Sequence, residues 1–67
     1  MKLIFENSRG EERVIAEPNS EAEAVDEIYK FCEERNFKIY YYRTWKPEGK
    51  RRVYDVGSHV EFFYLED

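Results

Sequence analysis

The sequence predicts an α+β fold in which one helix packs on an antiparallel five-stranded sheet, in the order ββαβββ. Two observations carry this prediction: several short apolar and aromatic runs are separated by turn signals, and one stretch has helical periodicity with a capping signal before it. No linker, repeat or low-complexity segment interrupts the chain, so residues 1–67 are expected to form a single domain.

The first two strands are expected to form a hairpin. "KLIFE" at residues 2–6 and "ERVIAE" at residues 12–17 are extended runs, and the intervening "NSRG" is a turn sequence. Pro18 then ends the second extended run.

A helix is predicted from Glu21 to Arg35. Ser20 and Glu23 have the spacing of a capping box, and Asn36 suits the left-handed conformation that ends a helix. Buried positions recur at helical spacing along this stretch, at Val25, Ile28 and Cys32, flanked by Ala22, Ala24, Tyr29 and Phe31.

Three further strands are expected in the second half of the chain. "FKIYYYRTW" at residues 37–45 has the aromatic and β-branched content of a strand, and "KPEG" is a turn. "KRRVYDV" at residues 50–56 and "HVEFFYL" at residues 59–65 then pair around Gly57-Ser58, which suits a two-residue hairpin turn.

That turn predicts the two faces of the sheet. A two-residue loop places Val53 opposite Phe62, and the helix is then expected to cover Ile39, Tyr41, Val53, Val60 and Phe62. The opposite face is expected to show Lys38, Tyr40, Tyr42, Arg52, Tyr54, Phe63 and Leu65. An open face this aromatic indicates a binding surface, with Tyr40, Tyr42, Arg52, Tyr54 and Phe63 as its candidate contact residues.

Charge is distributed unevenly along the chain, whose net charge is -4. Residues 1–36 carry ten acids and five bases, whereas residues 37–67 carry five acids and six bases. Most of the excess acid falls on the predicted helix, and four basic residues crowd the turn from Lys46 to Arg52. The acidic helix face, with Glu23, Asp26, Glu27 and Glu34, is open to three interpretations: solvation, DNA mimicry or docking to a basic partner.

No catalytic or cofactor motif is present, so neither an enzyme nor a cofactor is expected. His59 has no second histidine to share a metal ion and is interpreted as a structural residue beside a turn. Cys32, the only cysteine, is expected to be a buried and inert thiol. Neither a signal peptide nor a membrane span is recognisable, and a cytoplasmic protein is expected.

The passages "YDVGSHVEFFYLE" and "IAEPNSEAEAV" resemble small uncharacterised proteins carried by phages and mobile elements of Gram-positive bacteria. This resemblance covers most of the chain and implies no catalytic residues. The size and the ββαβββ order are also similar to those of some small anti-CRISPR inhibitors, which act by binding a host complex.

The sequence therefore supports two alternative functions. The first is a module that binds a host protein or nucleoprotein, because tyrosine and arginine are enriched where proteins meet. The alternative is single-stranded nucleic-acid binding on the aromatic face, although an acidic protein forfeits most counterion release. Pairing of two aromatic faces in a homodimer is also predicted.

Overall fold

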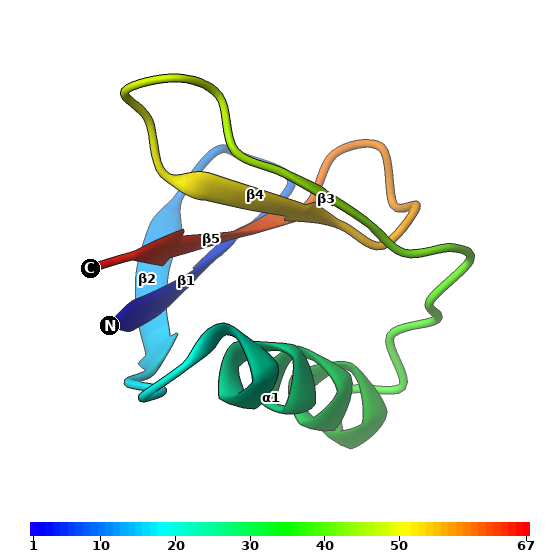
Figure 1. The fold of residues 1–67 in the computed structure, drawn as a ribbon. Coiled ribbons are helices and arrows are strands. Elements are labelled where there is room, and N and C mark those ends of the chain that lie inside the picture. The colour runs from blue at the N-terminus through cyan, green and yellow to red at the C-terminus, as the bar shows by residue number, and fades with distance from the viewer.

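Five short strands and one helix make up the structure, a computed structural model that describes all residues from 1 to 67. The helix lies against one face of the antiparallel sheet (Figure 1), which confirms the predicted α+β fold and its ββαβββ order. The elements are β1 (Lys2–Glu6), β2 (Glu12–Ala16), α1 (Glu21–Glu34), β3 (Arg43–Trp45), β4 (Arg52–Asp55) and β5 (Phe62–Glu66).

The sheet has the strand order β2-β1-β5-β4-β3, with the first and last strands of the chain side by side near its middle. Lys2 pairs with Glu66, so the two ends of the chain lie close together (Figure 1). The β1–β2 hairpin turns at Asn7, whose side-chain Oδ1 accepts hydrogen bonds from the backbone N–H groups of Arg9 and Glu11. In the strand order given above, β2 and β3 are the two edges of the sheet.

Helix α1 begins at the predicted residue, Glu21, and ends at Glu34, one residue before the predicted end. The Ser20 hydroxyl accepts a hydrogen bond from the Glu23 N–H at 3.2 Å, and the Glu23 carboxylate reaches back to the N–H of Asn19 rather than to that of Ser20. Arg35 is the C-cap, and Asn36 follows with φ 52°, in the left-handed region expected of it. These caps satisfy backbone groups that the helix itself leaves unpaired.

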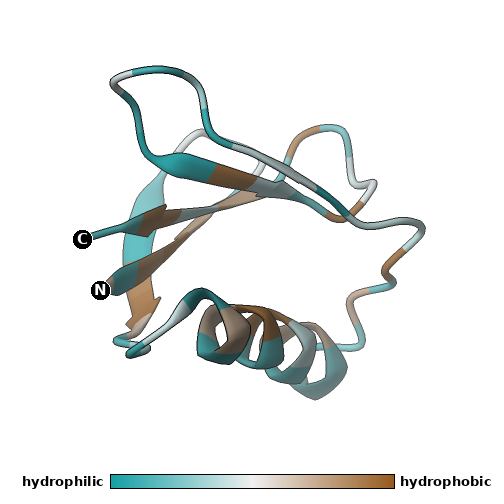
Figure 2. Ribbon diagram, viewed as in Figure 1, coloured by the Kyte–Doolittle hydropathy of each residue, from teal (hydrophilic) through white to brown (hydrophobic).

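The core lies between α1 and the sheet. The helix contributes Ala24, Ile28, Phe31 and Cys32, with Val25 partly buried, whereas Ala22 and Tyr29 remain exposed. Hydrophobic and hydrophilic segments alternate along α1 and the strands, and the loop that joins β3 to β4 is hydrophilic (Figure 2). Burial also raises the pKa of the Cys32 thiol, with the charge of Glu61 as a smaller cause, so the buried thiol stays protonated as expected.

The prediction of which sheet face the helix covers is wrong. Tyr54 and Phe63, expected on the open face, are 1% and 0% exposed and belong to the core, as does Leu65. The register pairs Tyr54 with Phe63 and Arg52 with Leu65, two residues further along β5 than a two-residue turn gives. Because side chains alternate with period two, this shift keeps the four residues on one face. That face is the one that α1 covers.

The contribution of β1 explains why this face is the covered one. Leu3 pairs with Leu65 and Phe5 with Phe63, whereas the other face of β1 carries one apolar residue, Ile4, between the charged residues Lys2 and Glu6. The rings of Phe5 and Phe63 lie 5.3 Å apart, and that of Phe31 meets Phe63 edge-on at 5.5 Å. Covering this side therefore buries more apolar surface than covering the other.

The strands of the second half are shorter than predicted. Residues 37–42 are irregular rather than extended in the sheet, and residues 56–61 form a longer connection than the expected Gly57-Ser58 turn. The Tyr40 N–H donates to the Val56 carbonyl at 3.0 Å, which ties the two irregular segments together. Gly57 has φ 92°, and a Cβ built there would lie 2.8 Å from the Tyr40 Cβ, so only glycine fits this contact.

Candidate binding surface

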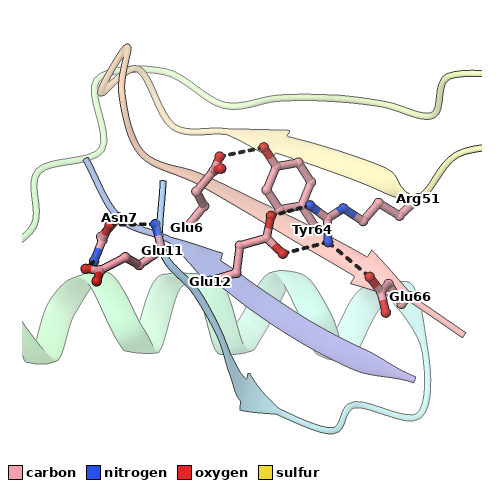
Figure 3. Close-up of polar contacts among 7 residues, drawn as sticks. All are labelled: Glu6, Asn7, Glu11, Glu12, Arg51, Tyr64 and Glu66. Carbon is pink, nitrogen blue, oxygen red and sulfur yellow. Dashed lines mark hydrogen bonds and ion pairs between the residues drawn. The ribbon is translucent and has the colours of Figure 1, made fainter. Parts of the chain in front are cut away.

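A cluster of charged side chains lies on the sheet face that the helix leaves open. The register aligns apolar side chains from all five strands on this face, namely Val14, Ile4, Tyr64, Val53 and Trp45. Across the middle of that row the Arg51 guanidinium lies 3.8 Å from the centre of the Tyr64 ring and bonds to Glu12 and Glu66 (Figure 3). We call Glu12, Arg51, Tyr64 and Glu66 the Arg51 clamp.

The Arg51 clamp spans the sheet and sets two glutamate charges against the single charge of Arg51. Its two bonds to Glu12 measure 2.9 and 2.6 Å, and Glu12 lies on β2 while Arg51 immediately precedes β4. The hydrogen bond from Arg51 lowers the pKa of Glu12, and burial together with a bond to Glu6 raises the pKa of Tyr64 to about 12. The arginine and the glutamates of the clamp therefore stay charged at neutral pH. Because these charged groups lie across the apolar row, this face is not a continuous aromatic patch.

Exposed aromatic side chains gather instead along the β3 edge of the sheet. Tyr40, Tyr41, Tyr42 and Trp45 are 67, 40, 37 and 41% exposed. Arg43 lies among them, with its guanidinium 5.3 Å from the Tyr41 ring centre and 5.5 Å from that of Trp45. We call Tyr40, Tyr41, Tyr42, Arg43 and Trp45 the edge strip.

Packing on neighbouring elements fixes the edge strip in place. Tyr42 lies between Tyr29 of α1 and the buried Tyr54, with ring centres 6.3 and 6.1 Å away. Tyr40 and Tyr41 lie against Gly57, and Lys38 lies 4.9 Å from the centre of the Tyr40 ring. Aromatic side chains held in this way lose little further conformational freedom when a partner binds.

The buried carboxylate of Asp55 binds residues in the middle of the edge strip. Although its side chain is buried, it accepts hydrogen bonds from Arg43 at 2.7 Å, from the Gly57 N–H at 2.9 Å and from the Tyr41 hydroxyl at 3.4 Å. Burial alone raises the pKa of Asp55, but the bonds from Arg43 and Gly57 outweigh it, and the pKa lies below its usual value. Asp55 thus holds Arg43 and Tyr41 as a charged group.

Asparagine in place of Asp55 should lower the free energy of unfolding at neutral pH by about 1–3 kcal/mol, because charged hydrogen bonds are lost. The folded-state pKa is depressed, so the contribution of the carboxylate is present above its unfolded pKa of about 4 and is lost as pH falls through the folded value. The wild type and Asp55→Asn should therefore converge in stability at acid pH. Urea unfolding between neutral and strongly acid pH measures this, with Glu48→Gln in an exposed turn as control. A difference that is independent of pH would contradict the assigned role.

The five residues predicted to form one open sheet face are divided by the structure. Tyr40 and Tyr42 are exposed, as expected, but they lie in the irregular segment. Tyr54 and Phe63 are core residues, and Arg52 is half-buried beside the helix, where it forms an ion pair with Glu21 at 3.3 Å. Tyr41, which was expected under the helix, is exposed, and Arg43 and Trp45 join it on the surface although sequence reasoning did not select them.

The acidic residues predicted on the helix lie at its surface. Glu23, Asp26 and Glu34 are exposed and Glu27 is half-buried. None of the four forms an ion pair, whereas Glu12, Asp55 and Glu66 on the sheet are paired with arginine. α1 therefore carries a group of unpaired acids, whereas the arginine of the edge strip is neutralised by Asp55.

His59 is exposed and has φ 73°, a conformation that non-glycine residues seldom adopt. It lies in the loop of residues 56–61, beside Tyr40 and Tyr41 in a shallow hollow at the end of the edge strip. No three acidic, histidine or cysteine side chains are placed to share a metal ion. The helix is neither long enough nor apolar enough to cross a membrane.

Comparisons with protein-family models, with curated proteins and with solved structures found no match for this chain.

Proposed function

We propose that this protein is a small non-catalytic binding module that contacts a partner protein through the edge strip. The observation that supports the proposal most strongly is the exposure of four large aromatic side chains along a single edge, two of them beside the Arg43 guanidinium. Tyrosine, tryptophan and arginine dominate the energetic centres of protein interfaces. The tyrosines of the strip also pack on neighbouring elements, which lowers the entropy cost of binding.

The partner in this proposal is a host protein or nucleoprotein. The resemblance of the sequence to small phage and mobile-element proteins suggests an accessory factor that binds and modulates such a target. A cytoplasmic location fits the proposal, because a single buried cysteine suits a reducing compartment. The unpaired acids of α1, with Glu23, Asp26, Glu27 and Glu34, form a second surface that suits a basic region of the same partner.

Single-stranded nucleic-acid binding is the alternative function, and one observation favours it. Cations alternate with rings along the edge strip, since Lys38 lies over Tyr40 and Arg43 lies beside Tyr41 and Trp45. Bases stack on such rings while cations contact phosphates. The net charge of -4 opposes this function, because counterion release supplies most nucleic-acid affinity.

Alanine substitution of Tyr40 or Trp45 should weaken partner binding by about 30-fold or more, the loss typical of an energetic centre. The experiment is affinity capture from a bacterial lysate with tagged wild type and each variant, followed by titration of the captured partner. Val60→Ala is the control, because Val60 is also exposed but lies outside the strip. Thermal melts establish that each variant is folded.

Nuclease treatment and oligonucleotide titration separate the two functions. Capture that survives nuclease and is lost in Tyr40→Ala or Trp45→Ala supports a protein partner. Binding of labelled single-stranded DNA or RNA that the same variants abolish would favour the alternative. Capture that is equal in the strip variants and in Val60→Ala would eliminate the edge strip as the contact surface.

A further inference from the structure

The β2 edge of the sheet offers unpaired backbone groups to another strand. The Asn7 N–H donates to the Glu11 carbonyl, and hydrogen-bonded and non-hydrogen-bonded pairs alternate from that point as far as Ile4 and Val14, beyond which a β-bulge at Ile15 shifts the register so that Leu3 pairs with Ala16. Phe5 and Arg13 are therefore a hydrogen-bonded pair, and the N–H and C=O groups of Glu12 and Val14 point away from β1. Since β2 has no neighbour on that side, these groups are free to pair.

A groove of mixed charge runs beside this edge, between β2 and α1, with the side chains of Ile15 and Phe31 among its lining. Two acidic and three basic side chains surround it: Glu27, Glu34, Arg13, Lys30 and Arg35. None of these five forms an ion pair within the chain, although Arg35 lies over the Phe31 ring. A surface that carries both unpaired signs is complementary to a second copy of itself.

We propose that two copies of this chain pair through β2, antiparallel and related by a twofold axis at Val14. The register follows from charge. An axis at Arg13 places two arginines opposite each other, and one at Glu12 places two glutamates opposite each other, which destabilises the ladder. An axis at Val14 places Val14 opposite itself and Arg13 beside Ile15 of the second copy, and no like charges face each other between Glu12 and the bulge at Ile15.

In this arrangement the groove between β2 and α1 also contacts the second copy. Arg13 pairs with Phe5, and Phe5 packs against the core, so Arg13 lies on the helix side of β2. Beside Ile15 of the second copy, it approaches the groove that Glu27 and Glu34 of that copy line. The twofold axis repeats this contact, and the acids that are unpaired in one copy gain a cation from the other.

The dimer goes beyond the proposed function and does not depend on it. β3 lies at the opposite edge of the sheet from β2, so pairing at β2 leaves both edge strips free, although it engages Glu27 and Glu34 and leaves Glu23 and Asp26 as the free part of the acidic helix surface. The edge strips then lie at the two outer ends of a continuous sheet. Two strips on one rigid body allow bivalent binding to a partner with repeated sites.

Sedimentation velocity over a concentration series up to high micromolar tests the dimer with the unmodified chain. Val14→Pro removes one outward N–H without removing a bond to β1, so it should abolish the dimer and retain the fold. Arg13→Glu should weaken the dimer by roughly tenfold or more through the charges of the groove. Lys50→Glu makes the same charge change in the exposed β3–β4 turn and should leave the dimer unchanged.

Hydrogen exchange supplies an independent readout. The amide of Val14, at the axis, should be protected at high concentration and lose protection on dilution, whereas the Arg13 amide stays protected in both conditions. If Val14→Pro does not fold, Arg13→Glu against Lys50→Glu still decides the question. A monomer at every concentration overturns the proposal. A dimer that both Val14→Pro and Arg13→Glu leave intact also overturns it and places the contact on another surface.

Discussion

Replacement of Phe63 by alanine should lower the free energy of unfolding by about 3–5 kcal/mol, because a fully buried ring leaves a cavity that the core only partly refills. The Phe63 ring contacts Phe5 in β1 and Phe31 in α1, so its loss loosens the contact between the sheet and the helix. A loss of this size is a large fraction of the total stability expected of a small domain. Urea unfolding followed by circular dichroism measures it.

The neighbouring phenylalanine is the matched control. Phe62 is half-buried on the opposite face of the same strand, and Phe62→Ala should cost clearly less. If Phe63→Ala is unfolded from the start, the milder Phe63→Leu still ranks the two positions. A larger loss at position 62 than at position 63 would mean that the helix covers the other face, and equal losses would contradict the difference in burial between the two positions.

The same pair of residues shows how far the sequence predicts this fold. Alternation assigned the side chains of β4 and β5 to two faces, and that division is right even though the hairpin register is displaced by two residues. Local signals also located the helix, since Ser20 and Asn36 act at its two ends as predicted. Gly49 likewise adopts a positive φ of 71° in the "KPEG" turn.

The covered face was not predictable from these local signals, because both faces of β4 and β5 carry aromatic and aliphatic residues. The decision comes from β1, which is almost the whole chain away from β5 and places Leu3 and Phe5 beside Leu65 and Phe63. The Arg51 clamp depends on a similar long-range contact, since Arg51 bonds to Glu12 across the sheet. Spacing within one strand carries no information about either contact.

The candidate site was only partly predictable for a related reason. The residues of "FKIYYY" have high β-propensity, but only Arg43–Trp45 pairs with β4. The preceding residues are held instead by the Tyr40–Val56 hydrogen bond and by close contact with Gly57. Outside the ladder their side chains no longer alternate between two faces, and Tyr40, Tyr41 and Tyr42 are therefore all exposed. The alternation expected of a strand had assigned Tyr41 to the core.

Replacement of Ile28 by aspartate should abolish the fold at neutral pH. Ile28 is fully buried at the centre of the helix face that meets the sheet, and the core around it is apolar apart from the Cys32 thiol and the Tyr54 hydroxyl. A carboxylate at this position has no cation within the core, and burying an unpaired charge costs more than the roughly 5–10 kcal/mol of stability that a small domain has. The far-ultraviolet circular dichroism and the dispersion of amide proton signals should both be those of an unfolded chain.

Two further variants test whether the effect of Ile28→Asp is caused by the burial of this position. Ala22→Asp introduces the same charge at an exposed position in the first turn of the same helix, where an acid is favourable, and should keep the fold. Ile28→Val removes one methylene and should cost about 0.5–1.5 kcal/mol, which leaves a folded domain whose loss can be measured. An Ile28→Asp variant that melts cooperatively near the wild-type temperature would show that this face of α1 does not pack on the sheet. The assignment of Tyr54, Phe63 and Leu65 to the core would then be wrong, and these residues would again be candidates for a binding surface.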